Sequence, residues 1–206
     1  GTLSTASNNI GIGKDVFSAL TSGDTNIGLG VWACKLVEDG SNNTAVGAYA
    51  GRDISSGVAN TAIGASSGYG ITTGSYNVIM GYNAASAAVT GEKNIGIGYT
   101  ALNALTDGDF NICIGTAAGT TINTGNNNVV IGGMDVASAS GHDQLVISAG
   151  DGGHFWVKGD GDGACYQGDN ATAWSQTSDR SLKREITDAT KGLDAINEIQ
   201  VRNFRY

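Results

Sequence analysis

Residues 43–51 read Asn-Thr-Ala-Val-Gly-Ala-Tyr-Ala-Gly, and residues 60–68 read Asn-Thr-Ala-Ile-Gly-Ala-Ser-Ser-Gly, nearly the same stretch 17 residues later. The spacing extends over most of the chain, because eight asparagines follow one another at intervals of 17: Asn9, Asn26, Asn43, Asn60, Asn77, Asn94, Asn111 and Asn128. A glycine follows each by four residues, and a second glycine precedes seven of them by three. Columns that stay in phase over this length identify a repeat protein.

The three positions after each asparagine predict one short β-strand per repeat. The first and third hold mostly larger or β-branched residues, and such alternation with period two is typical of a strand. The second position is mostly small and forms a slim column: Gly11, Gly28, Ala45, Ala62, Ile79, Gly96, Cys113 and Val130. Because a glycine recurs in every repeat, we expect a tight turn in every repeat. Residues 1–148 therefore predict an all-β, 17-residue-repeat β-solenoid or β-roll of eight coils plus a degenerate last coil, with Leu145 in the place of asparagine.

Stacked coils would place the asparagines directly over one another, and their amides can then form a hydrogen-bonded ladder. A second apolar column lies eleven residues after the asparagines and is expected to close each coil: Leu20, Val37, Ile54, Ile71, Ala88, Leu105, Ile122 and Ala139. One such coil is too thin for a large core. We therefore expect the slim column to pack against other copies of the chain in a homotrimer, with a monomeric solenoid as the alternative.

Composition narrows the function. The 206 residues include 33 glycines and no proline, which excludes collagen. A net charge of −8 disfavours nucleic acid as a partner, and no apolar stretch is long enough to predict membrane insertion. Residues 1–9 show no secretion leader. Three cysteines and two histidines without ligand spacing predict no metal site, and glycine pairs that lack the third glycine of a dinucleotide loop predict no cofactor.

Four aromatic residues lie five or six positions after an asparagine, just past the expected turn: Trp32, Tyr49, Tyr82 and Tyr99. Exposed aromatic rings on a rigid fibre could stack on the sugars of a cell surface, so they are candidate receptor contacts. The alternative is that the rings pack between coils or chains. Paired carboxylates such as Asp107 and Asp109 lie beside repeat corners, where solvated turns explain them.

The repeats at residues 43–51 and 60–68 resemble two groups of proteins. One is the head repeat of trimeric autotransporter adhesins, and the other is the repetitive shaft of bacteriophage tail fibres. Both resemblances imply a trimeric β fibre, and the motif does not separate them.

The chain changes character after the repeats. Residues 149–177 read as a connector, in which residues 154–157 and 164–166 are short strand candidates and Asp160-Gly-Asp162-Gly is a turn rather than a calcium loop. Residues 178–206 carry six of the eleven basic residues and include a predicted amphipathic helix over residues 191–199, which adds a short α/β segment.

This last segment resembles the start of the endosialidase-type intramolecular chaperone that ends many phage tail fibres and tailspikes. The resemblance rests on residues 178–186, Ser-Asp-Arg-Ser-Leu-Lys-Arg-Glu-Ile, together with residues 192–196 and 203–206. It implies a trimerisation module that cuts itself off between Thr177 and Ser178, with Ser178 as nucleophile, Lys183 as its base and Asp179 as the motif's acid. A lysine can activate a serine in this way once desolvation lowers the pKa of its amine. Helix capping by Ser178 or Asp179 is the simpler alternative.

Together these features predict a structural and adhesive component of a phage tail fibre, located in the virion tail. Its partners would be copies of itself, other tail proteins and a glycan or protein on the host surface. The alternative is the head of a bacterial trimeric adhesin at the cell surface. Enzymatic activity is expected, if at all, only as single-turnover self-cleavage.

Overall fold

The computed structural model describes residues 5–149 and 154–167. The chain divides into two units, residues 1–173 and residues 174–206, and all described residues belong to the first. The predictions for Ser178, Asp179 and Lys183, and for the helix over residues 191–199, therefore lie outside the described residues.

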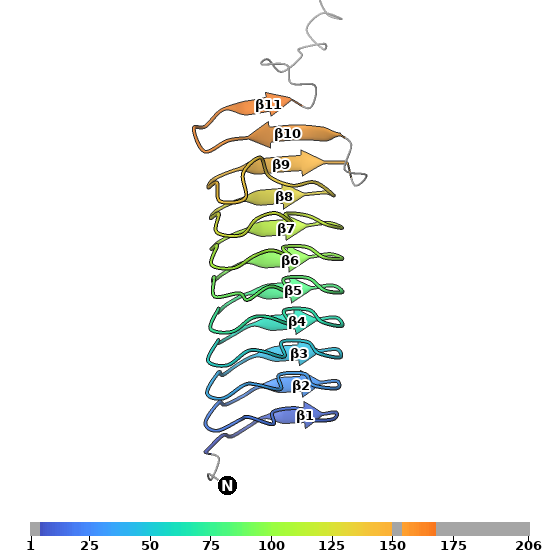
Figure 1. The fold of residues 1–206 in the computed structure, drawn as a ribbon, viewed down its shortest axis with the longest axis vertical. Helices are drawn as coiled ribbons and strands as arrows, with labels where there is room; N and C mark the ends of the chain where they lie inside the picture. The colour runs from blue at the N-terminus through green and yellow to red at the C-terminus, as the bar shows by residue number, and fades with distance from the viewer. Residues whose placement is uncertain (1–4, 150–153, 168–206) are drawn as a thin grey trace, which may run out of the picture. The chain divides into compact units, whose positions relative to one another are not determined.

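The described residues form a β-solenoid, which confirms the 17-residue coil (Figure 1). Each coil contributes one strand: β1 (Ile10–Ile12), β2 (Ile27–Leu29), β3 (Thr44–Val46), β4 (Thr61–Ile63), β5 (Val78–Met80), β6 (Ile95–Ile97), β7 (Ile112–Ile114), β8 (Val129–Ile131) and β9 (Leu145–Ser148). Neighbouring strands from β1 to β8 pair in parallel with a register of 17, as in Ile27↔Thr44. Outside the strands, backbone hydrogen bonds also join each coil to the next.

Two glycine columns let neighbouring coils come close enough to form these backbone hydrogen bonds. The glycine four residues after the asparagine has a positive φ in every coil, 139° at Gly98, and a Cβ there would lie 2.2 Å from the carbonyl oxygen of Gly115. The glycine three residues before the asparagine is kept for space: a Cβ on Gly91 would lie 2.1 Å from the oxygen of Gly108. The first column thus forms a left-handed corner, as predicted. The second column requires glycine only because a side chain there would collide with the backbone of the next coil.

The slim column faces the inside of its own coil, so the expectation that it packs against other chains is wrong. Ala45, Ile79 and Cys113 are fully buried within the single chain. Glycine occurs in this column where a large side chain from the other side of the coil occupies the space. A Cβ on Gly28, for example, would lie 2.6 Å from the Val16 side chain. The flanking first and third positions are the outward ones, since strands β2 to β6 alternate half-buried, buried and half-buried.

The column that closes each coil is confirmed at Val37, Ile54, Ile71, Leu105 and Ile122, which are buried. It is wrong at two positions. In the coil after Asn77 the buried residue is Val89, which bridges Ile71, while Ala88 is exposed. In the coil after Asn128 the buried residue is Val136, and Ala139 is only partly buried. In both coils a valine near the expected alanine fills the interior with more apolar volume.

The end of the solenoid departs from the prediction by one residue. Leu145 pairs with Val129 inside strand β9, so it occupies the first strand position, and Gln144 takes the place of asparagine. Strands β10 (Phe155–Gly159) and β11 (Cys165–Gln167) then add to β9 in antiparallel order. The two predicted connector strands are confirmed, and the edge of the last parallel strand is paired rather than open.

Candidate functional site

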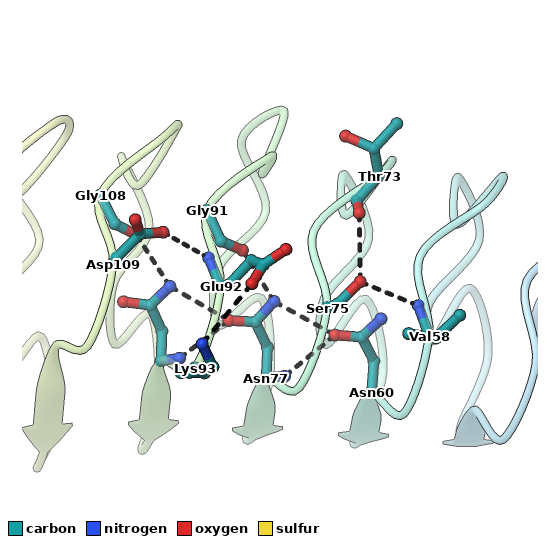
Figure 2. Close-up of polar contacts among 11 residues, drawn as sticks. Val58, Asn60, Thr73, Ser75, Asn77, Gly91, Glu92, Lys93, Gly108 and Asp109 are labelled. Carbon is teal, nitrogen blue, oxygen red and sulfur yellow. Dashed lines mark hydrogen bonds and ion pairs between the residues drawn. The ribbon is translucent and has the colours of Figure 1, made fainter.

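The asparagine ladder runs through the interior of the solenoid and is confirmed (Figure 2). In coil 6, which begins at Asn94, the side-chain Nδ2 donates to Oδ1 of Asn77 at 3.1 Å and to the carbonyl oxygen of Gly108 at 2.8 Å. The backbone N–H of Asn94 also donates to Oδ1 of Asn77, at 2.9 Å. From Asn26 to Asn128 every ladder side chain is buried, and the described residues hold no buried side-chain nitrogen or oxygen without a hydrogen bond.

The ladder therefore joins three segments at each level: the asparagine below, the turn above and the start of its own strand. The first link differs, because Asn26 donates only its backbone N–H to Asn9, at 2.7 Å, and Asn9 is only partly buried. The last link uses a longer side chain: Nε2 of Gln144 donates to Oδ1 of Asn128 at 3.2 Å.

A second ladder lies two residues before the asparagines and was missed by the sequence reasoning. Here a side chain of one coil accepts the backbone N–H of the preceding coil, as Ser75 Oγ does from Val58 at 3.1 Å and Asp109 Oδ1 does from Glu92 at 2.7 Å (Figure 2). Asp24, Ser41, Asn126 and His142 act in the same way. Short polar side chains recur in this column, which was the available signal. Asp109 is thus a structural residue.

The four candidate receptor aromatics separate into two pairs. Trp32 and Tyr49 contact each other edge to face, with ring centroids 5.3 Å apart. Trp32 Nε1 also donates to Asp15 at 3.0 Å, and the Lys35 amine lies 4.1 Å from its ring centroid. The Trp32 ring is therefore engaged by neighbours within the chain. Tyr82 and Tyr99 stack in parallel at 5.8 Å and remain 59% and 56% exposed.

The outward side of the strands forms a surface that we call the strand face. It comprises, in the eight coils that begin at an asparagine, the first and third strand positions together with the residue before each asparagine and the residue five after it. Nine of the twelve exposed large apolar side chains among the described residues lie here: Ile10, Ile12, Val31, Tyr76, Tyr82, Tyr99, Phe110, Ile114 and Ile131. The strand face contains no aspartate or glutamate, and its charged residues are Lys14 and Lys93, although the chain holds 19 acidic residues.

One edge of the strand face has a left-handed backbone. The residue before the asparagine has a φ between 56° and 61° in all eight coils, and it is an asparagine in three of them. Asparagine tolerates this conformation, whereas bulky residues strain it. Tyr76 and Phe110 nevertheless occupy this edge, 54% and 51% exposed, with the Lys93 amine 4.8 Å from the Phe110 ring centroid. The sequence reasoning missed both aromatics because it searched only behind the turn.

The buried cysteines and the Asp160 turn have structural explanations. Burial raises the pKa of the Cys34 and Cys113 thiols to about 12, with the Asp135 charge adding to the effect at Cys113, so both thiols stay protonated at neutral pH. Asp160 accepts the backbone N–H groups of Asp162 and Ala164, as in a plain turn. Within residues 5–149 and 154–167 no cluster of histidine, cysteine and acidic side chains could hold a metal, and no helix could cross a membrane.

Comparison with protein-family models, curated proteins and solved structures finds no match for this chain. The resemblances to tail fibres and adhesin heads therefore stay hypotheses that rest on the residues themselves.

Proposed function

We propose that the chain is a structural and adhesive segment of a phage tail fibre, assembled as a homotrimer and carried in the virion tail. Its partners are two further copies of itself, other tail proteins and a glycan or protein on the host surface. The observation that carries this proposal is the strand face, which is long, apolar and free of acidic residues in a chain of net charge −8. Large apolar surfaces of this kind are typical of interaction sites.

The hydrogen bonds of the interior support a role as a stiff fibre. Asparagine, hydroxyl and backbone hydrogen bonds join every coil to the next, so bending or stretching the rod would break many of them together.

The alternative is the head of a bacterial trimeric adhesin, which the repeats at residues 43–51 and 60–68 favour equally. Immunogold labelling with antibodies against the purified chain separates the two. Labelled fibres on isolated virions are expected for the phage proposal, whereas label on the outer surface of uninfected bacteria would favour the adhesin. Label on neither would contradict both.

Association and self-cleavage have tests of their own. Sedimentation equilibrium should return three times the 20.8 kDa of one chain, and a monomer would remove the trimer from the proposal. If Ser178 and Lys183 act as the resemblance implies, the intact mass of the natural protein falls on incubation while that of Ser178→Ala does not. Equal masses would exclude cleavage.

A further inference from the structure

The strand face is suited to another copy of this chain, a step that rests on the proposed assembly. Copies with a net charge of −8 repel one another over most of their surfaces. The strand face lacks acidic groups in all eight coils, so two copies can approach there without placing carboxylates against each other. Its exposed isoleucine, tyrosine and phenylalanine side chains would lose their contact with water in doing so.

Parallel strands restrict how the copies can meet. Since β1 to β9 all point the same way, the strand face has one edge that holds every strand start and another that holds every strand end (Figure 1). Consider a ring of copies about an axis parallel to the solenoid, with the strand faces turned toward that axis. Rotation then places the start edge of one copy beside the end edge of the next, at the same coil, whatever the number of copies.

Side chains on the two edges fit this arrangement in coils 4 to 6. In coil 5, which begins at Asn77, the start edge carries Tyr76 and the end edge carries Tyr82. In coil 6 the start edge carries Lys93 and the end edge carries Tyr99, a cation beside an aromatic ring. In coil 4 both edges carry alanine, at Ala59 and Ala65. Aromatic side chains at the two edges thus lie in neighbouring coils, where the circular arrangement of copies would bring them into contact.

Backbone strain at the start edge also favours a contact with a second copy. Tyr76 has a φ of 60°, in a column where asparagine is available and common. Tyr76 is 54% exposed, so packing within the chain offsets little of the strain. A contact with a second chain would offset it.

We infer that copies of this chain associate through the strand face in a parallel, in-register ring, in which Tyr76 of each copy packs against Tyr82 of the next. Within one chain these two residues lie beyond opposite ends of β5, six positions apart in sequence, and the three extended residues of β5 alone span about 10 Å. That separation exceeds the range of about 8 Å over which charges act at physiological salt.

Charge rescue tests the pairing in the full-length chain by sedimentation. Tyr76→Glu should weaken association by about 30-fold or more, as expected for a buried aromatic anchor. Adding Tyr82→Lys should recover about tenfold, because the lysine of one copy then faces the glutamate of the next. The matched control adds Thr116→Lys instead, which lies on the same edge two coils away, and should recover less than about threefold. Tyr76→Asn serves as a second variant, since asparagine suits the backbone and should weaken association while the coils stay folded.

Each result has a distinct meaning. Unchanged association in Tyr76→Glu and Tyr76→Asn overturns the inference. Equal recovery by Tyr82→Lys and Thr116→Lys overturns the pairing but leaves the oligomer of the proposed function intact. A monomeric mass for the unchanged chain overturns both.

Discussion

The two sides of the same strands obey different rules. On the inner side asparagine occurs in all eight 17-residue coils, and its carboxamide spans the asparagine of one neighbouring coil and the turn of the other. On the outer side the residue immediately before that asparagine is Asn, Thr, Ala, Tyr, Lys or Phe, even though its backbone conformation is the same in every coil. Hydrogen bonding in the buried interior requires a carboxamide side chain at this position, whereas backbone strain at the solvent-exposed edge is tolerated.

This contrast separates architecture from recognition. A buried amide without its partners costs about 1–3 kcal/mol for each lost bond, so every ladder position, Gln144 included, keeps a carboxamide. A left-handed tyrosine costs on the order of 1 kcal/mol, which a contact elsewhere can offset. The positions that vary despite a cost are therefore the ones to examine for binding, and Tyr76 and Phe110 are the clearest of these.

The strongest way to break the contrast is to remove one ladder amide. Asn94→Leu removes two donated and two accepted bonds, which leaves the Gly108 carbonyl and the Asn111 N–H buried without them. We expect a loss of about 4 kcal/mol or more in urea unfolding. Asn9→Leu is the matched control and should cost clearly less, because Asn9 is partly buried and has no asparagine before it. Equal losses would contradict axial stacking as the source of stability.

The next largest effect tests the glycine corner. Gly98→Val places a side chain 2.2 Å from the Gly115 oxygen in a left-handed conformation, so a loss of a few kcal/mol and a lower melting temperature are expected. Gly163→Ala separates the two causes. Gly163 has a φ of 84°, but a Cβ added there would meet no atom within 4 Å, so this variant carries the strain alone, about 1 kcal/mol. A melting temperature unchanged by Gly98→Val would show that the corner can open.

The repeat, the strand in each coil, the ladder and the left-handed glycine corner could be predicted from the sequence. All four depend on identical residues meeting at identical positions, which a fixed period of 17 reveals directly. Val89 and Val136 could not be predicted by counting, because the coil shifts by one or more residues to bury the larger side chain. Gln144 replaces asparagine for a similar reason: its longer side chain reaches Asn128 across a coil that is one residue shorter.

The direction of the strand face was the main error, and period-two alternation explains why. Alternation says that two faces differ without saying which is inside. We expected the slim column to face other chains, but in a coil with a single three-residue strand Ala45 of that column is fully buried within its own chain. Isoleucine and valine are then left outside. The first and third strand positions, which carry the proposed assembly, could therefore be identified from the sequence, but the side of the strand that faces other chains could not.

The smallest effect sharpens the contrast at the edge itself. Thr25→Asn should stabilise its coil by up to about 1 kcal/mol, because asparagine tolerates the φ of 60° that strains a β-branched residue. Asn42→Thr makes the reverse change one coil away, at a φ of 61°, and should destabilise by a similar amount. Hydrogen exchange of the adjacent Ile27 and Thr44 amides, which donate to the next coil, reports each coil locally. Shifts of the same sign in both variants would mean that side-chain contacts at this edge outweigh the backbone, and the strain assigned to Tyr76 would then lose its basis.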